Sequence, residues 1–555
     1  MSRPQNYPLS ISTKGTQDHY TGRWGVLKPF FDEKLSPCRH RCPGSIHIPK
    51  FMNLVQDQNL TDAWRTICEE NPMPRITGRV CFHPCEEDCL RQNLDQPIAI
   101  HQVERFVGDW AFKNGLRHFE PTGDLTGPRL AVIGSGPAGI GCCYHLLRLG
   151  YQVSLFEAMP ELGGLLRYGI PGYRLPKDVL SEELEMILGS WVGLHPGVKI
   201  GRDISWEEIQ SDFEGIFLGP GAQQSISLGL EGEEIGGVAD GLDFLKTVEA
   251  NPFIRPGQRV LILGGGNTAF DVARAVLRLQ GLPLILYRRS KEEMPAFEDE
   301  IMEAEEEGIE VRTLISPRGI VRDEEGLKGL TCVRNRITDL GPDGRRGFVP
   351  IEGSDHFMAG DFIVTAFGHL ADAEALPSGV KVVHGSVTVT AQGAAGSGGV
   401  FAGGDVTAAP RSVIHALASG KRGALGLDAY FKHQKEVRPD KFTPLPLVKA
   451  DQINLHYFSQ SLRMVPERRL ATERVSDFHE IQATLTPEAA AQEASRCVKC
   501  GFCNACGNCA FFCPDLAVCL DPGNQTILID DRYCKGCCIC VEECPRGVLS
   551  VEVET

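Results

Sequence analysis

The 555-residue sequence lacks several features that mark whole classes of protein. It has no run of 18 apolar residues, so we expect no membrane-spanning helix. Its first residues, MSRPQNYPLSISTKG, contain no apolar segment of the kind found in a secretory signal. Basic residues are fewer than acidic ones, and the net charge is −16. This balance argues against nucleic acid or an anionic membrane surface as a partner.

Cysteine, by contrast, is abundant, with 21 residues grouped mainly near the two ends of the chain. A chain of this length should hold about three to five domains. Disulfide frameworks are typical of small secreted proteins, whereas spaced cysteines on a long chain favour metal binding in a reducing compartment. We therefore expect a cytoplasmic protein that contains metal-binding domains.

The stretch from Leu130 to Glu157 has every part of a dinucleotide-binding fingerprint. A short apolar strand, 130–133, precedes a glycine-rich turn and an apolar-periodic helix, and a second strand, 153–156, ends in Glu157. The glycines allow a tight turn, close approach of a pyrophosphate and close helix–strand packing, and the carboxylate can hold a ribose hydroxyl. The candidate cofactor-binding residues are Gly134, Gly136, Pro137, Ala138, Gly139 and Glu157.

A second fingerprint begins at Arg259, where strand 260–263 leads into a glycine turn and a helix. Its candidate cofactor-binding residues are Gly264, Gly265, Gly266, Asn267 and Thr268. The next strand, 282–287, ends in Arg288 and Arg289. A carboxylate at this position would favour NAD, whereas two guanidinium groups favour the 2′-phosphate of NADP. The alternative is that both arginines are simply solvated.

Three further stretches complete the nucleotide-binding region. Residues 162–180 are rich in glycine and proline and predict a shaped loop, with Gly164, Leu165 and Arg174 as candidate cofactor contacts. Strand 362–366 returns the chain from the second fingerprint, and strand 399–405 ends in Gly404 and Asp405, which could reach a flavin. A final helix is expected from Ser419 to Tyr430. The glutamate-rich stretch EEMPAFEDEIMEAEEEG is interpreted as a solvated helix face.

The first 125 residues are expected to be mostly helical, with helices over 48–56, 60–70 and 100–113. Cysteines at 38, 42, 81, 85 and 89 have spacings suited to iron–sulfur ligation. The alternative is a set of reduced core cysteines, which is our interpretation of Cys68.

The C-terminal region contains two ferredoxin-type cysteine runs, each ending in Cys-Pro. In such pairs the fourth cysteine of each run ligates the other cluster. One cluster should therefore use Cys503, Cys506, Cys509 and Cys544, and the other Cys534, Cys537, Cys540 and Cys513. Zinc is the alternative metal. Cys519 and Cys538 are expected to pack in the core, and Cys497 and Cys500, although they could substitute as ligands, are expected not to do so.

Residues from about 30 to 435 resemble the small, flavin-bearing subunit of glutamate synthase and the N-terminal half of dihydropyrimidine dehydrogenase. The matching stretches are NPMPRITGRVCFHPCEEDC, AVIGSGPAGI, GGLLRYGIP with YRLPK, LGGGNTAFD, YRRSKEEMPA and FAGGDV. The resemblance implies FAD at the first fingerprint and NADPH at the second, with NADH possible, and hydride transfer to the flavin. The C-terminal stretch DRYCKGCCICVEECPRGVL looks like the ferredoxin-type subunit of 2-oxoacid:ferredoxin oxidoreductases.

The same family has two N-terminal 4Fe–4S clusters, but no cysteine precedes Cys38 in this chain. We therefore expect the site of Cys38 and Cys89 to be empty. By the resemblance, the other site keeps Cys42, Cys81 and Cys85, with Glu104 of IAIHQVERF as an unusual fourth ligand and Cys89 as the alternative. The chain should then carry one N-terminal and two C-terminal 4Fe–4S clusters, or about twelve irons.

The expected fold is α/β, with two nested Rossmann-like dinucleotide-binding domains, an N-terminal helical iron–sulfur domain and a C-terminal α+β ferredoxin-like domain. The expected boundaries are 1–125 for the helical iron–sulfur domain, 126–248 and 368–438 for the FAD-binding domain, 249–367 for the NADPH-binding domain, 439–496 for a linker, and 497–555 for the ferredoxin domain.

These features predict an NAD(P)H-dependent flavin and iron–sulfur oxidoreductase that exchanges electrons with a catalytic partner subunit or a ferredoxin in a hetero-oligomer. A 2-oxoacid oxidoreductase is one such partner. No acid–base catalytic residue is expected at the nicotinamide. The alternatives are a glutamate synthase small subunit, a bifurcating ferredoxin:NADP oxidoreductase subunit, a flavin disulfide reductase using Cys142 and Cys143, and a subunit whose clusters serve only stability.

Overall fold

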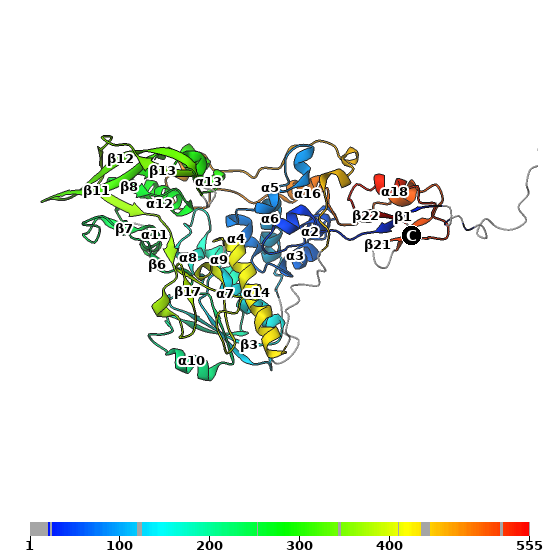
Figure 1. Ribbon diagram of the computed structural model, residues 1–555, viewed down its shortest axis with the longest axis horizontal. Helices are drawn as coiled ribbons and strands as arrows, with labels where there is room; N and C mark the ends of the chain where they lie inside the picture. The colour runs from blue at the N-terminus through cyan, green and yellow to red at the C-terminus, as the bar shows by residue number, and fades with distance from the viewer. Residues whose placement is uncertain are drawn as a thin grey trace, which may run out of the picture.

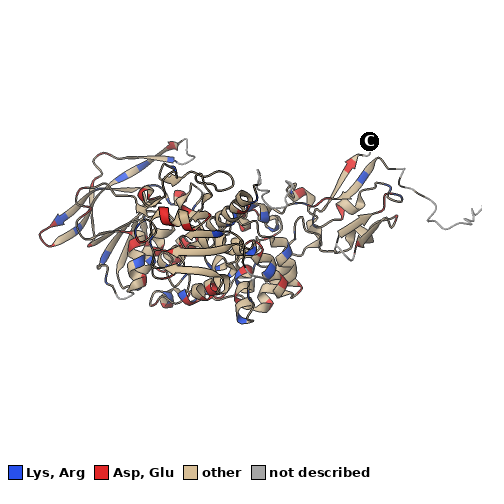
Figure 2. Cartoon of the chain, turned by 90° about the horizontal axis from the view of Figure 1, so that it is seen from below, with Lys and Arg blue, Asp and Glu red and all other residues tan. Residues whose placement is uncertain are grey.

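The computed structural model describes residues 20, 22, 25–118, 125–251, 254–341, 346–408, 410–433, 445–521 and 526–553. The molecule is elongated: the sheet of the second nucleotide-binding unit and the ferredoxin-type unit lie at opposite ends of the long axis, with the N-terminal helices between them (Figure 1). Acidic and basic residues are interspersed along the described elements, and no basic stripe is visible there in Figure 2. None of the described helices is long and apolar enough to cross a membrane.

The N-terminal unit is helical because its apolar residues recur at helical spacing and face one core. Its longest helices are α2 (Ile48–Gln56), α3 (Leu60–Cys68) and α6 (Ile100–Lys113), close to the predicted ranges. Phe51, Ile67 and Val103 are fully buried between them. The shorter elements are α1 (Pro37–Arg41), α4 (Pro74–Val80), α5 (Pro84–Glu87) and η3 (Leu90–Asn93).

The first nucleotide-binding unit is built on a five-stranded sheet with the order β19-β5-β2-β3-β4, in which all pairings are parallel. Its strands are β2 (Arg129–Ile133), β3 (Gln152–Glu157), β4 (Val192–Pro196), β5 (Gly215–Leu218) and β19 (Val400–Ala402). Helices α7 (Pro137–Arg148) and α14 (Val413–Phe431) pack so closely that a Cβ on Gly420 would lie 2.1 Å from the Ala138 carbonyl oxygen. Helix α14, which was predicted to begin at Ser419, begins earlier, at Val413. Its N-cap is Ser412, whose hydroxyl accepts a hydrogen bond from the His415 amide.

The second nucleotide-binding unit interrupts the first, as the order of the fingerprints predicts. Its parallel sheet has the order β10-β9-β8-β15-β7. The elements are β7 (Val238–Asp240), α11 (Gly241–Ala250), β8 (Arg259–Leu263), α12 (Asn267–Arg278), β9 (Leu282–Leu286), η4 (Lys291–Glu293), α13 (Glu298–Glu306), β10 (Glu310–Arg312) and β15 (Phe362–Thr365). Between β10 and β15 in the sequence, the chain forms a separate antiparallel sheet. Its strands are β11 (Ile315–Asp323), β12 (Gly326–Leu340), β13 (Arg346–Pro350) and β14 (His356–Ala359).

Two predictions about this region were wrong in part. The stretch 162–180 is not wholly loop, because it contains α8 (Leu165–Tyr168) and the start of α9 (Lys177–Leu188). The glutamate-rich stretch does have an exposed face, with Glu298, Glu305 and Glu306 of α13, but Glu303 and Glu307 are buried. They are held by arginines that lie outside the stretch and that local charge patterning does not reveal.

The remaining elements connect these units. They are α10 (Trp206–Asp212), β6 (Gln224–Ser225), β16 (His369–Leu370), η5 (Ala373–Ala375), β17 (Val382–Val383), β18 (Ser386–Val387) and η6 (Gly404–Val406). The predicted linker contains η7 (Ala450–Gln452), η8 (Leu455–Tyr457), α15 (Ala471–Arg474) and α16 (Pro487–Arg496).

The ferredoxin-type unit contains α17 (Asn508–Phe511), β20 (Val518–Asp521), β21 (Thr526–Ile529), α18 (Ile539–Glu542) and β22 (Leu549–Val553). Strand β1 (Leu27–Phe31) pairs antiparallel with β22, so that Leu27 lies opposite Val553 and Phe31 opposite Leu549. The start of the chain thus belongs physically to the unit formed by its end, which the sequence did not predict.

The expected domain boundaries remain predictions. Those at 438 and at the end of the first 125 residues lie at or beside segments 434–444 and 119–124, which are outside the described residues. Strand β7 joins the second sheet although it precedes residue 249, where that domain was expected to begin. The second sheet therefore extends to residues before the predicted boundary.

Candidate cofactor and cluster sites

The first glycine turn has the geometry of a phosphate-binding loop. Gly134 has a φ of +99°, and a Cβ there would lie 2.3 Å from the Gly219 carbonyl oxygen. A Cβ on Gly139 would lie 1.9 Å from the Gly134 carbonyl oxygen, so the helix can approach the turn only without a side chain. A Cβ on Gly136 would meet no atom within 4 Å. The backbone there borders open space at the start of α7, where Pro137 and Ala138 begin the helix, and anions bind favourably at such a terminus.

The other predicted residues of the first site surround this turn. Both Glu157 carboxylate oxygens are engaged: Oε2 accepts from the Ser135 amide at 2.9 Å, and Oε1 accepts from the Met159 amide at 2.8 Å. Gly164, which precedes Leu165 at the start of α8, lies close enough that its Cβ would be 3.0 Å from the Gly136 Cα. The fingerprint and the 162–180 stretch therefore form two walls of one site.

The end of β19 forms a third wall. A Cβ on Gly404 would lie 2.9 Å from the Cβ of Ala138, and the Gly404 amide donates to the Ser419 hydroxyl at 2.7 Å. Burial raises the pKa of the neighbouring Asp405 carboxyl, and Arg411 counteracts this rise. The Gly404–Asp405 turn thus lies where the sequence predicts a flavin contact, beside the first glycine turn.

The second glycine turn is similarly constrained. A Cβ on Gly264 would lie 2.6 Å from the Ala366 carbonyl oxygen, and one on Gly265 would lie 2.6 Å from the Tyr287 ring. A Cβ on Gly266 would meet only the Pro295 side chain, at 3.9 Å, so the space at the start of α12 is open. The Asn267 side-chain oxygen accepts from the Phe297 amide at 3.0 Å, and Thr268 follows in the first turn of the helix.

Arg288 and Arg289 follow β9 beside this turn. Their guanidinium carbons lie 5.3 and 5.8 Å from the centre of the Phe348 ring. Among the described residues neither arginine forms an ion pair, although Arg289 donates to the Arg346 carbonyl. Their positive charge is therefore not neutralised by a carboxylate of that part of the chain.

Arg174 has a different environment from the one that the sequence suggested. Its guanidinium contacts Asp271 of α12 at 2.8 Å and Glu300 of α13 at 2.7 Å. Arg174 therefore joins the first unit to the second, and its role in binding a cofactor stays a prediction.

The ferredoxin-type cysteines are arranged in two groups that cross between the runs. Cys503, Cys506, Cys509 and Cys544 line one cavity. Burial raises the pKa of Cys540 to about 12, and Cys534, Cys513 and Cys537 are among the neighbours that raise it. This arrangement is the one that the sequence predicts for two clusters.

The expectation that the two extra cysteines of this region pack in the core was wrong. Cys519 is exposed, because it lies on the outward face of the short β20 strand. Cys538, which precedes α18, is only partly buried and has a φ of +59°.

Near the flavin-type site, Cys42, Cys81, Cys85 and Glu104 line one cavity, called the flavin-side cavity below. Ile414, in the first turn of α14, lines it too, so this cavity adjoins the first nucleotide-binding unit. Burial raises the pKa of Glu104 to about 7, while hydrogen bonds from Thr77 and Asn71 lower it. The four side chains that meet here are those predicted as ligands from the resemblance, and their role as ligands stays a prediction.

Cys38 and Cys89 do not face this cavity. They line a second one, and Cys497 and Cys500 line it with them. Cys68, Cys142 and Cys143 are buried at 4% exposure or less and line none of the three cavities. The burial of Cys142 and Cys143 agrees with their interpretation as core residues and disfavours disulfide chemistry.

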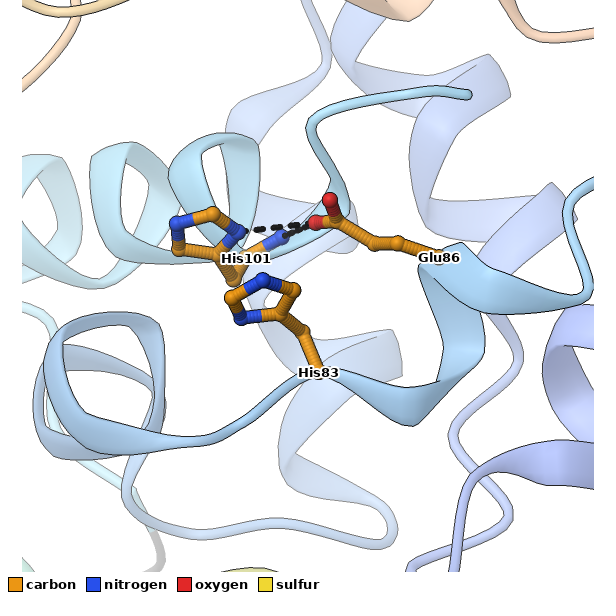
Figure 3. Close-up of side chains that lie close together, drawn as sticks. All are labelled: His83, Glu86 and His101. Carbon is orange, nitrogen blue, oxygen red and sulfur yellow. Dashed lines mark hydrogen bonds and ion pairs between the residues drawn. The ribbon is translucent and has the colours of Figure 1, made fainter. Parts of the chain in front are cut away.

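A group that the sequence analysis missed lies beside the flavin-side cavity. His83, Glu86 and His101 have ligand-type atoms within 4.8 Å of one another (Figure 3). His101 Nδ1 lies 2.8 Å from a Glu86 oxygen, and the two imidazole rings stack with centres 3.9 Å apart. Arg463 contacts the other Glu86 oxygen at 2.5 Å, so the carboxylate is already neutralised. The group is therefore better described as a charge network than as a vacant metal site.

Comparisons with known proteins agree with this geometry. Residues 33–116 match the family described as dihydropyrimidine dehydrogenase domain II, 4Fe-4S cluster, and residues 128–420 match pyridine nucleotide-disulphide oxidoreductase. The chain is 34% identical to the NADP(+)-dependent formate dehydrogenase subunit beta of Moorella thermoacetica, over 86% of this chain and 71% of the relative.

Two further relatives match over most of this chain. The NADPH-Fe(3+) oxidoreductase subunit beta of Geobacter sulfurreducens is 30% identical over 86% of this chain and 77% of its own length. The glutamate synthase [NADPH] small chain of Escherichia coli is 32% identical over 70% of this chain and 87% of its own length. The expected fold, the cofactors FAD, NADPH and 4Fe–4S clusters, and the resemblance stated from the sequence are confirmed. The chain belongs to the glutamate synthase small-subunit-like family of FAD- and NADPH-dependent iron–sulfur oxidoreductases.

Proposed function

We propose that this chain is the electron-transfer subunit of a larger oxidoreductase, and that it moves electrons between NADPH and a separate catalytic subunit or ferredoxin. The observation that carries the proposal is the order of the sites along the molecule. The NADP-type turn lies near one end, the cysteine-lined cavities of the helical unit lie in the middle, and the ferredoxin-type unit lies at the other end (Figure 1). Bound FAD and 4Fe–4S clusters supply the chemistry that converts a two-electron hydride into single electrons.

The residues of the chain bind and orient these groups. The two glycine turns leave backbone amides free for phosphates, and Arg288 and Arg289 supply positive charge for a 2′-phosphate. Phe82, next to Cys81, stacks on Phe297 with ring centres 5.1 Å apart and lies 5.9 Å from His415. This aromatic contact joins the helical, NADPH-type and FAD-type units, and Phe82 and Phe297 line an open cavity there.

The names of the relatives support a role as a subunit. The Moorella and Geobacter relatives are named as beta subunits, and the match to each extends over more than 500 residues. The match to the glutamate synthase small chain is shorter, at 419 residues. We therefore favour a role like that of the first two over a role in glutamate synthesis.

The proposal is tested by adding NADPH anaerobically to the purified holoprotein. The flavin absorbance should bleach, and the absorbance of the clusters should then decrease, before an external ferredoxin or low-potential dye is reduced. NADH should act more weakly. A flavin that neither nicotinamide bleaches would contradict the proposal and would favour clusters that serve only stability.

The second candidate is a glutamate synthase small subunit, favoured by the relative that shares 32% identity with this chain. It predicts glutamine-dependent formation of glutamate when the protein is combined with a glutamate synthase large subunit. A bifurcating subunit predicts instead that oxidation of NADPH reduces a low-potential and a high-potential acceptor in equal amounts. Neither result is expected for a simple electron-transfer subunit.

A further inference from the structure

Four cysteines from the two ends of the chain surround one small cavity. Cys38 lies in α1 and Cys89 precedes η3, whereas Cys497 caps the end of α16 and Cys500 follows it. All four line one cavity. They also lie close enough to interact electrostatically: burial raises the pKa of Cys500, and Cys38, Cys497 and Cys89 raise it further.

This cavity resembles the two that the sequence assigned to clusters. The ferredoxin-type cavity is lined by Cys503, Cys506, Cys509 and Cys544, and the flavin-side cavity by Cys42, Cys81, Cys85 and Glu104. Each of the three has four candidate ligands, and the remaining lining is largely apolar. The ferredoxin-type cavity therefore serves as an internal standard for the number of ligands and the lining of a 4Fe–4S site.

The spacing of the sulfur atoms argues for a cluster over a single ion. Four thiolates around one zinc ion, with Zn–S bonds of about 2.3 Å, lie about 3.8 Å apart. Among the described residues, no three cysteine sulfurs lie within 4.8 Å of one another, either here or in the ferredoxin-type groups. The four thiols are also free of disulfides. A cubane of iron and sulfide separates its ligands more widely and suits this arrangement.

Buried ion pairs hold the two chain segments together around the cavity. Arg91, only 2% exposed, contacts Asp95 at 2.6 Å and donates to the Arg496 carbonyl at 3.0 Å. Arg496 forms an ion pair with the same Asp95 at 2.9 Å, and the Glu493 carboxylate accepts a hydrogen bond from the Ala99 amide at 2.7 Å. Cys89 and Cys497 are thus fixed by bonds made directly beside them, which is the preorganisation that a metal site needs.

We infer that Cys38, Cys89, Cys497 and Cys500 bind a further 4Fe–4S cluster, shared between the N-terminal helical unit and the segment that enters the ferredoxin-type unit. The site expected to be empty is completed by the two cysteines that were expected not to act as ligands. Because their thiols come from both ends of the chain, neither end could assemble the site alone.

The position of this site gives it a role between the other clusters. On one side, Cys38 lies close enough to Cys85 of the flavin-side cavity to interact with it electrostatically. On the other side, Arg546 lines the ferredoxin-type cavity, donates to the Val498 carbonyl and interacts with Cys500. A cluster here connects the flavin-side cluster to the ferredoxin-type pair and makes the row of clusters continuous.

Metal analysis of the anaerobically purified full-length protein tests the inference. We expect about sixteen irons and as many sulfides per chain, counted at four irons for each of four clusters. The double variant Cys497→Ala with Cys500→Ala should lose about four irons and keep its FAD. The matched control, Cys68→Ala with Cys332→Ala, removes two buried thiols that line none of the three cavities and should lose none.

A second variant guards against a general folding defect. Cys38→Ala, at the opposite end of the chain, should remove the same electron paramagnetic resonance signal of the dithionite-reduced protein as the double variant does. Twelve irons in the unaltered protein, stoichiometric zinc, or different signals lost from the two variants would overturn the inference. Dithionite reduces the clusters without NADPH, so this outcome is independent of the proposed function. In the double variant, NADPH should still bleach the flavin, while reduction of the ferredoxin-type clusters slows at least tenfold.

Discussion

At the scale of single residues, the predicted ligands line shared cavities and most candidate cofactor contacts border the glycine turns, but many of their neighbours come from distant parts of the chain. Glu104 of α6 faces Cys42, Cys81 and Cys85 across one cavity. Arg174 faces the second nucleotide-binding unit and contacts Asp271. A motif identifies which residues are available, whereas the tertiary contacts decide what each residue touches.

Glu104 should be required for the flavin-side cluster. Its carboxylate lines the cavity while Cys89, the alternative fourth ligand, lines another. We expect Glu104→Ala to lose about four irons per chain, and Glu104→Gln, which keeps an oxygen donor, to retain most of them. Glu183→Gln, which alters a buried glutamate outside the cavity, is the control. A full iron content in Glu104→Ala would exclude the carboxylate as a ligand.

Arg288 and Arg289 should determine the preference for NADPH. Replacing both by alanine removes charge-assisted hydrogen bonds worth roughly 1.5–3 kcal/mol each. The KM for NADPH should therefore rise about a hundredfold or more, while the KM for NADH changes little. Steady-state reduction of a dye measures both constants. Arg318→Ala, an exposed arginine paired with Asp355, should leave both unchanged. An equal loss for the two nicotinamides would assign the arginines to some other role.

At the scale of elements, the region of helix α13 differs most from what its sequence suggested. Its glutamates suggest a solvated surface, but Glu307, which follows the helix, contacts Arg274 at 2.7 Å and Arg278 at 2.8 Å with all three side chains fully buried. Arg474 of α15, in the predicted linker, contacts Glu306 at 2.6 Å. The network ties the linker to the NADPH-type unit. Burial raises the pKa of Glu307, but bonds from Arg278 and Arg274 outweigh this effect and lower it to about 2.

Removal of this buried carboxylate should destabilise the second nucleotide-binding unit. Glu307→Gln removes the carboxylate that pairs with the buried Arg278 and one of the carboxylates around Arg274, and should cost roughly 3–5 kcal/mol. Hydrogen exchange of the α12 amides measures this locally, since a multidomain chain does not unfold in two states. Glu305→Gln, whose partner Lys291 is exposed, should cost less than about 1 kcal/mol.

The same carboxylate gives the unit a defined response to acid. Its folded-state pKa lies below the ordinary 4.5, so its contribution is fully present above pH 4.5 and is lost as the pH falls towards 2. Glu307→Gln should therefore be less stable than the unaltered protein at pH 7, and the difference should shrink as the pH falls through that range. An unchanged difference at pH 3 and pH 7 would show that the ion pairs do not cause the destabilisation.

At the scale of the whole molecule, the two chain ends meet. Strand β1 forms the edge partner of β22, and Lys28 adds an ion pair with Asp531 at 2.7 Å. Farther along, Leu35 exchanges backbone hydrogen bonds with the segment before η7. The ferredoxin-type unit is therefore not a detachable tail, because residues near the start of the chain complete its sheet.

Deletion of residues 1–33 should weaken this unit selectively. It exposes the unpaired edge of β22, which favours local opening and aggregation. We expect the irons of the two ferredoxin-type clusters, about eight per chain, to be released to a chelator several times faster, while the FAD content stays the same. Deletion of residues 1–19 retains β1 and should leave the release rate unchanged. Equal rates for both deletions would mean that the β1–β22 pairing does not protect the clusters.

Much of the architecture followed from local patterns. The glycine turns, the ferredoxin-type runs and helices such as α6 are encoded by spacings within a few turns of chain, because one strand, turn or helix determines which residues are neighbours. The nesting of the two nucleotide-binding units followed from the order of the fingerprints. The burial of Glu303 and Glu307 did not, because their arginine partner lies on another element, α12.

The sequence by itself thus determined the cofactors, since each is recognised by a contiguous motif. Only the tertiary structure decided which cysteines share a cavity and where the first strand pairs. Cys38 and Cys500 are separated by most of the chain, and so are Leu27 and Val553. Such contacts arise because packing buries apolar surface wherever shapes fit, and no periodicity in the sequence records which distant segments will meet.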